Sequence, residues 1–89
     1  MKIKGEFIMR QVLDEYVLVP VNDTALHFNG IIRLTSVSAL IWEKLEKGAD
    51  HEAILNDLLQ EFNVERETAA ADLDEFLQIL QEKGLVEDL

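Results

Sequence analysis

The 89-residue sequence predicts an α+β fold in which a three-stranded antiparallel sheet is followed by three helices. Before residue 35, apolar residues come in short runs rich in Val, Ile and aromatic side chains and are separated by turn residues, which is typical of strands. After residue 35, they recur every three or four residues, as on one face of a helix. The length fits one compact domain, 1–89, and 48% hydrophobic residues can form its core.

The first two strands are expected from Phe7 to Leu13 and from Tyr16 to Val21. A tight turn at Asp14-Glu15 joins them, because these polar residues interrupt two apolar runs. Pro20 has no N–H to donate to a ladder, so it places that end of the second strand at a sheet edge or at the end of the strand.

A second hairpin is predicted from Ala25 to Phe28 and from Ile31 to Leu34. The reason is Asn29-Gly30 between them, since both central residues of a type I′ turn need a positive φ. The alternative is an irregular loop followed by a single strand. In either case Ile31 to Leu34 is the last strand of the sheet.

Three helices follow, each with its own start and stop signals. Thr35 or Ser36 can cap the first, which ends at Gly48, and Asp50 caps the second. The third runs from about Glu65 to Lys83, before Gly84, and Leu85 and Val86 fold back as a tail. The inward residues are Val37, Leu40, Ile41 and Leu45 in the first helix, Ile54, Leu55, Leu58, Leu59 and Phe62 in the second, and Ala69, Leu73, Phe76, Leu77 and Leu80 in the third.

This element order is winged-helix-like, but the charge does not suit a DNA reader. The chain has 8 Lys and Arg against 18 Asp and Glu, a formal net charge of -10. Binding to duplex DNA depends on cationic side chains that neutralise phosphates, so we expect no nucleic-acid partner. We also expect no membrane partner, because the longest apolar run, Tyr16 to Val21, is far below the ~20 residues that span a bilayer. The absence of Cys fits a reducing, cytoplasmic location.

No arrangement of residues indicates catalysis. His27 and His51 have no His or Cys three or four residues away, which argues against a metal site. Ser36 and Ser38 have no neighbouring base, and the glycines are spaced as turn and cap residues, not as a phosphate loop. Trp42 lies off the centre of its apolar stripe; a core position is favoured over an exposed, binding one. We therefore expect no enzyme activity, metal or cofactor.

The remaining candidate is a strand edge. If the outer side of Ile31 to Leu34 is uncovered, its N–H and C=O groups can pair with an extended peptide, which adds as a fourth strand. The third helix could form the other wall of a groove, through either the flank of Ala70 and Leu77 or that of Asp72 and Ile79. The predicted peptide-binding residues are Ile31, Ile32, Arg33, Leu34, Ala70, Leu73, Asp74 and Leu77.

Five segments form a pattern that extends over nearly the whole chain: residues 16–20 (YVLVP), 28–34 (FNGIIRL), 39–45 (ALIWEKL), 71–80 (ADLDEFLQIL) and 83–86 (KGLV). In this pattern the chain resembles the PqqD-like proteins. The resemblance implies a recognition element for ribosomally made, post-translationally modified peptides, known as a RiPP recognition element. Such a domain binds a precursor's leader peptide against the third strand and third helix. It presents that peptide to a modifying enzyme, often a radical S-adenosylmethionine (radical SAM) maturase.

The chain departs from the family pattern before the first helix. Where the family commonly has Leu-Asn, this chain has Leu34-Thr35, and Ser38 replaces a frequent Gly. Thr still caps a helix, so fold and peptide binding are retained. The pathway stays open between pyrroloquinoline quinone biosynthesis, a lasso-peptide pathway and a radical-enzyme peptide pathway. The alternative function is a winged-helix regulatory domain that binds protein, and the sequence leaves open whether the chain forms a homodimer through the strand edge.

Overall fold

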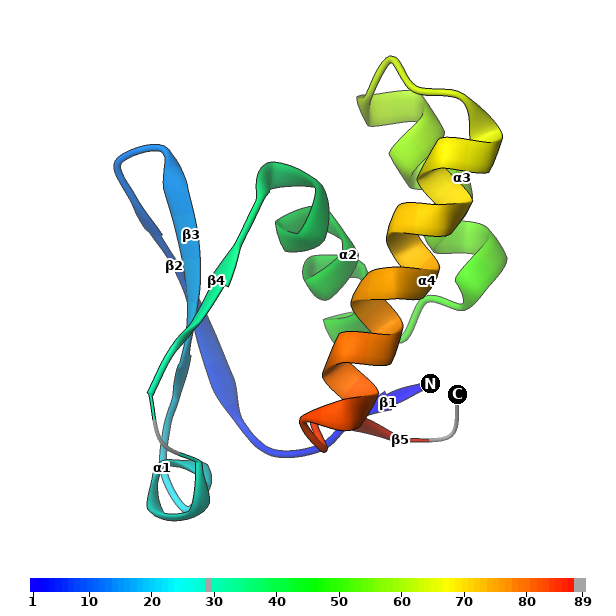
Figure 1. Ribbon diagram of the computed structural model, residues 1–89. Coiled ribbons are helices and arrows are strands. Elements are labelled where there is room, and N and C mark those ends of the chain that lie inside the picture. Colours follow the sequence, from blue (N-terminus) through cyan, green and yellow to red (C-terminus); the bar gives the residue numbers. More distant parts are fainter. Residues whose placement is uncertain (29, 88–89) are drawn as a thin grey trace. The chain divides into compact units, whose positions relative to one another are not determined.

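The computed structural model describes residues 1–28 and 30–87 (Figure 1). It divides into two compact units, residues 5–39 and residues 1–4 with 40–89, here called the sheet unit and the helix unit. The elements in chain order are β1 (Lys2–Ile3), β2 (Phe7–Val12), β3 (Glu15–Pro20), α1 (Thr24–His27), β4 (Ile32–Leu34), α2 (Ser36–Glu46), α3 (His51–Glu61), α4 (Arg66–Glu82) and β5 (Val86–Glu87).

The sheet unit contains the expected three-stranded antiparallel sheet, in the order β2-β3-β4. The turn between β2 and β3 lies one residue earlier than predicted, at Leu13-Asp14, because Val12 pairs with Glu15. This register places Leu18, which is fully buried, opposite Met9. A turn at residues 14–15 would place the polar Gln11 opposite Leu18, whereas the observed register pairs the buried Leu18 with the apolar Met9.

The predicted second hairpin is wrong for Ala25 to Phe28, which form no strand. Residues 24–27 make the single helical turn α1, and the Phe28 N–H donates to the Thr24 carbonyl over 2.9 Å. Side-chain bonds hold this loop to the start of β2: Thr24 Oγ1 accepts from the Glu6 N–H over 2.7 Å. The Asn22 amide donates to the Glu6 carboxylate over 2.6 Å. These tertiary bonds outweigh the local turn signal of Asn29-Gly30, of which Asn29 lies outside the described residues.

Pro20 limits the pairing between β3 and β4. In the observed register Leu18 lies opposite Ile32, so Pro20 would lie opposite residue 30. Proline has no N–H to donate there, and the ladder therefore ends at Ile32. The prediction that Pro20 marks the close of its strand agrees with this geometry.

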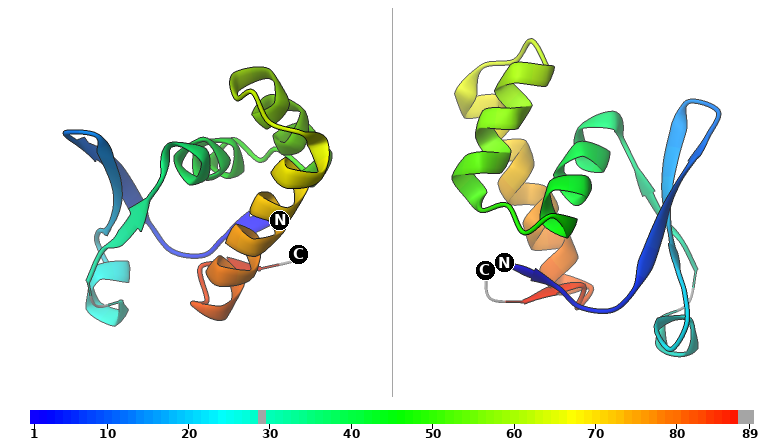
Figure 2. Two further views of the ribbon diagram at one scale, coloured as in Figure 1. Left: turned by 45° about the horizontal axis from the view of Figure 1, so that its top comes forward. Right: turned by 180° about the vertical axis from the view of Figure 1, so that it is seen from behind.

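The helix unit is held together by the apolar faces of its helices. The predicted stripe of the first helix is shifted, because Ala39 is buried beside Ile41 and Leu45, whereas Val37 and Leu40 are only half-buried. Views from two further directions show α3 and α4 side by side (Figure 2). Trp42 is 1% exposed, so the prediction that it belongs to the core is confirmed. The fully buried side chains of this unit are Ile41, Ile54, Leu73 and Leu80, with Leu58 and Trp42 at 1% exposure.

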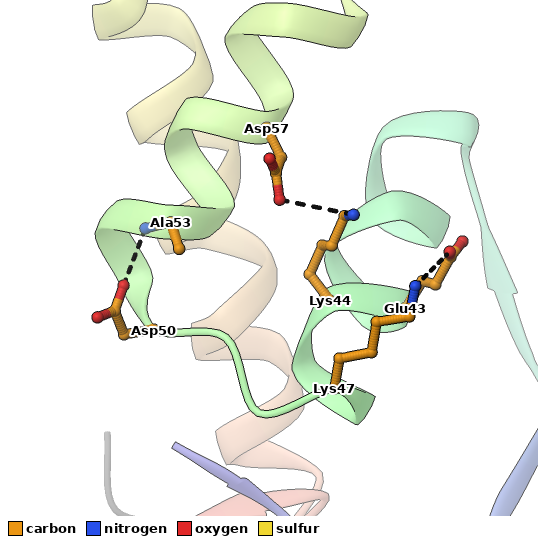
Figure 3. A network of polar contacts seen from close by, with 6 residues as sticks. All are labelled: Glu43, Lys44, Lys47, Asp50, Ala53 and Asp57. Atoms are coloured by element: carbon orange, nitrogen blue, oxygen red, sulfur yellow. Dashed lines mark hydrogen bonds and ion pairs between the residues drawn. The ribbon is translucent and has the colours of Figure 1, made fainter.

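Polar contacts fix where α3 begins and how it lies against the end of α2 (Figure 3). Asp50 accepts a hydrogen bond from the Ala53 N–H over 2.9 Å, which confirms it as the N-cap of α3. Lys44 of α2 pairs with Asp57 of α3 at 3.6 Å. No helix in the described part of the chain is long and apolar enough to cross a membrane.

The chain ends form a small sheet that the sequence pattern did not predict. Ile3 in β1 pairs with Val86 in β5, and the Lys4 N–H donates to the Leu85 carbonyl over 2.7 Å. The expected tail at Leu85 and Val86 is thus a strand partner for the start of the chain. Two-residue strands are too short to show an alternating pattern.

Candidate functional site

The free edge of β4 in the sheet unit is the main candidate site. β4 lies at one end of the strand order, and no other strand in the described part of the chain pairs with its outer side. Such an edge can accept another extended chain. Which backbone groups face outward follows from the register of the sheet.

The hydrogen-bond parity can be traced from the open end of the first hairpin. The Val21 N–H donates to the Glu6 carbonyl over 3.1 Å. Antiparallel pairs alternate between hydrogen-bonded and non-bonded, so the pair Arg10 and Val17 is also bonded. The intervening β3 residues, Tyr16 and Leu18, therefore direct their backbone groups towards β4.

Arg33 presents its backbone N–H and C=O to the free edge. Ile32 and Leu34 lie opposite Leu18 and Tyr16, so their backbone groups pair with β3. Arg33 lies opposite Val17 in a non-bonded pair, and its backbone points the other way. Of Arg33 and Leu34, between which the sequence did not decide, the register selects Arg33 as the outward donor.

The helix cap closes this edge directly after β4. Thr35 Oγ1 accepts from the Ser38 N–H over 3.1 Å, while the Thr35 N–H donates to Ser38 Oγ over 2.9 Å. The two residues thus satisfy each other's backbone donors as a capping box does, with Ser in the place usually taken by Glu or Gln. The Thr35 N–H is therefore unavailable to an added strand. The outward backbone groups of Arg33 and Ile31 remain available for pairing.

The predicted residues in the sheet unit differ in exposure. Ile31 is 54% exposed and Arg33 is exposed, while Ile32 is half-buried and Leu34 is 5% exposed. Leu34 and Ile32 lie on the same sheet face as Leu18. Leu34 therefore belongs to the core, and its expected role is to hold β4 in register.

The predicted residues in the helix unit lie on one flank of α4. Leu73 is fully buried and Leu77 is 6% exposed, whereas Ala70 is half-buried. Asp74 leaves 67% of its side chain exposed and lies 2.7 Å from His51 Nε2 at the start of α3. This contact turns the Asp74 flank of α4 towards α3.

A hollow of about 510 Å³ adjoins the His51 and Asp74 pair, and its lining includes Leu77. The opposite flank of α4 carries the exposed Asp72 and Ile79, of which Ile79 is 38% exposed. The sequence pattern did not predict the contact between His51 and Asp74. The signal that could have indicated it is the Asp50 cap, which places His51 in the first turn of α3.

No cluster of metal ligands accompanies these surfaces: in residues 1–28 and 30–87, no group of three or more His, Asp or Glu could hold a metal ion. The observable chemistry is therefore a set of backbone donors and acceptors at an edge strand, together with an acidic helix surface.

Comparison with known proteins identifies the family. A family model described as Coenzyme PQQ synthesis protein D (PqqD) matches residues 15–86, which span β3 to β5. The chain belongs to the PqqD family. The family resemblance found in the sequence is thereby confirmed.

A solved structure similar to this PqqD-family chain is described as "TbiB1 in Complex with the TbiA(beta) Leader Peptide". Its chain is 31% identical, with a TM-score of 0.78, and the match covers 100% of this chain and 98% of that one. No curated protein sequence gives a significant match. The structural match supports the predicted α+β fold over the full PqqD-family chain.

Proposed function

We propose that this PqqD-family protein is a non-catalytic adaptor. It binds the leader peptide of a ribosomally synthesised precursor and presents that peptide to a modifying enzyme, such as a radical SAM maturase. The free edge of β4 carries the proposal, because it offers backbone groups to an extended peptide. The similar TbiB1 chain, which is in complex with a leader peptide, supports it.

In this proposal the leader adds as a fourth strand beside β4. The Arg33 N–H donates to a peptide carbonyl, and the Arg33 carbonyl accepts from a peptide N–H. These main-chain bonds supply affinity that does not depend on the peptide's side chains, while specificity comes from pockets for alternate side chains. The short β4 strand allows few such bonds, so further contacts must contribute to affinity.

The α4 residues are proposed as peptide contacts of the helix unit. The buried Leu73 and Leu77 support the helix, which leaves Ala70 and the exposed Asp74 as the members that can touch a ligand. Asp72, Asp74 and Glu75 give α4 an acidic surface that favours a leader with basic residues.

An adaptor of this kind can promote modification only by binding the leader and the enzyme, without taking part in the reaction. A leader joined to its core segment turns a bimolecular encounter with the enzyme into a tethered one, and short tethers give effective concentrations of about millimolar. The adaptor must also release the product. We expect a leader dissociation constant from nanomolar to low micromolar, or roughly -12 to -8 kcal/mol.

Strand addition is tested by a proline at the outward donor. Arg33→Pro removes an N–H that faces away from β3, a position where an edge strand tolerates proline. Arg33→Ala is the matched control, because it removes the same side chain and keeps the N–H. With the leader encoded beside this gene, Arg33→Pro should lose at least about tenfold in affinity relative to Arg33→Ala, since a buried acceptor loses its partner.

Fluorescence anisotropy gives the affinities, and amide NMR spectra show that both variants are folded. Equal leader affinity in folded Arg33→Pro and Arg33→Ala would contradict strand addition. Asp74→Asn and Asp72→Asn each remove one carboxylate charge, on opposite flanks of α4. The variant with the larger loss of leader affinity then identifies which side of the helix the leader touches.

A further inference from the structure

The sheet unit has a second surface, which is distinct from the edge of β4. It is the sheet face opposite to Leu18, here called the outer sheet face. A row crosses it from Arg10 on β2 through Val17 on β3 to Arg33 on β4, because these residues lie opposite one another in the two registers. Ile8 and Val12 share this face, since strand residues two apart point to the same side.

The outer sheet face concentrates positive charge in an acidic protein. Arg10 and Arg33 are the only Lys or Arg residues between positions 5 and 39, and both side chains belong to this face. Among the described residues, neither guanidinium forms an ion pair with a carboxylate. Glu15 lies diagonally from Arg10 on the same face, and by alternation so does Glu6, whose carboxylate accepts from the Asn22 amide. The two guanidinium groups are thus free to bind an external carboxylate.

The same hairpin exposes apolar side chains. Ile8 is 42% exposed, Val12 is 56% exposed and Leu13, in the adjoining turn, is 90% exposed. Leu13 also has a φ of 57°, a region that disfavours L side chains. An exposed leucine at a strained turn contributes nothing to the core. Strain of this kind at a surface points to a role in binding.

We propose that the outer sheet face docks the peptide-modifying enzyme through a carboxylate-bearing, partly apolar surface of that enzyme. The inference rests on the proposed function. Arginine binds carboxylates with two parallel hydrogen bonds, and the apolar neighbours exclude water, which strengthens the ion pairs. Ile8, Val12 and Leu13 supply the apolar part of the contact, whereas Val17, at 9% exposure, is largely covered.

Geometry separates this surface from the proposed leader site. The Arg33 backbone points along the plane of the sheet, whereas its side chain points to the outer face. Arg10 lies two strands away from β4, at about 10 Å given the usual strand spacing. The β4 edge and the outer sheet face are therefore different sides of the sheet unit. A second copy of the chain is a poorer occupant, because two proteins of net charge -10 repel each other.

The test is a charge reversal with a matched control. Arg10→Glu reverses one charge on the outer sheet face, and Lys47→Glu makes the same change on an exposed residue of the helix unit. Binding of the enzyme encoded beside the precursor gene is measured by calorimetry, with the leader present. Arg10→Glu should weaken enzyme binding at least about tenfold and Lys47→Glu less than about twofold, since contact charges matter more than total charge.

Leader affinity, measured separately, should be the same in both variants and the wild type. If leader binding persists, either of two results would overturn the inference. The first is equal enzyme affinity of Arg10→Glu and Lys47→Glu, and the second is that the wild type does not bind the enzyme. If the wild type does not bind the leader, the proposed function itself is refuted.

Discussion

Leu13 shows that single residues can work against the stability of the fold. It is the first residue of a two-residue hairpin loop, has a φ of 57° and is 90% exposed. Asp14, the second loop residue, is not in the positive-φ region, which fits a type II′ turn. This turn type prefers Gly at its first position. The leucine therefore adds strain without adding packing.

We expect Leu13→Gly to raise the free energy of unfolding by about 1 kcal/mol, because a sparsely populated backbone conformation with positive φ costs a side chain about 1–3 kcal/mol. Part of this gain is offset by the freer unfolded chain. Leu13→Ala, which removes the side chain but keeps the strain, should change stability by less than about 0.5 kcal/mol. Urea denaturation measures both. Equal stabilisation by Gly and Ala would show that strain is not the cause.

Glu46 carries the other residue-scale prediction. Partial burial, and secondly the neighbouring Glu43, raise the pKa of Glu46 above its ordinary value. The folded protein then holds this proton more tightly than the unfolded chain, so ionisation of Glu46 costs stability as pH rises through its folded-state pKa. Its place at the end of α2 adds to this cost, because the helix dipole disfavours a negative charge there.

Glu46→Gln should therefore stabilise the protein at pH 7, by about 0.2–0.5 kcal/mol, the usual size of a like-charge helix pair. The advantage should shrink below the pKa of Glu46, where the wild type is also neutral. Denaturation at pH 7 and pH 4 measures the difference. Glu43→Gln is a partial control, since it relieves the repulsion but not the burial. A pH-independent difference would contradict this account.

At the scale of elements, caps and proline decide where strands and helices end. Thr35 and Ser38 close the start of α2, and Pro20 ends the ladder between β3 and β4. Two departures from the family pattern, Thr35 and Ser38, meet in one capping interaction. The Ser at position 38 thus compensates for the Thr at position 35.

A double-mutant cycle tests this compensation. Thr35→Ala should cost about 1 kcal/mol of stability, as loss of an N-cap does. Ser38→Ala should also be destabilising, because it removes the side-chain acceptor of the Thr35 N–H. The double variant should be more stable, by at least about 0.5 kcal/mol, than the sum of the two single-variant costs predicts, since residues in one network are coupled. Additive costs in urea denaturation would mean that the two side chains act independently.

At the scale of the whole molecule, the net charge and the two partners of the proposed adaptor set the expected behaviour. The net charge of -10 opposes binding to phosphate backbones. The proposed adaptor role needs a binding edge and two partners, and no reactive side chain. Its effect should therefore appear only when precursor and modifying enzyme are both present.

Reconstitution of the modification reaction measures this effect. At limiting precursor, omission of the protein should lower the initial rate at least about tenfold, because tethering is lost. A precursor without its leader is the control, and its rate should not depend on the protein. An unchanged rate on omission would refute the adaptor role. Conversion of the precursor by the protein alone would refute the prediction that it has no activity of its own.

The sequence by itself determined the helices and the order of the main strands. Helical periodicity extends over eleven or more residues, so a single misread residue does not change the pattern. The cap at Asp50 followed from local signals, whereas Trp42 lies off its helical stripe and was favoured as a core residue for its size. The expected binding strand, Ile31 to Leu34, contains β4, and the family resemblance agreed with it.

Only the tertiary structure decided the turn at Leu13-Asp14, the helical turn α1 and the pairing of β1 with β5. Each depends on partners far apart in the chain, such as Glu6 with Thr24, and no local pattern encodes them. The outward direction of the Arg33 backbone likewise depends on hydrogen-bond parity across three strands. A one-residue shift would reverse it, which is why register, and not propensity, defines the candidate site.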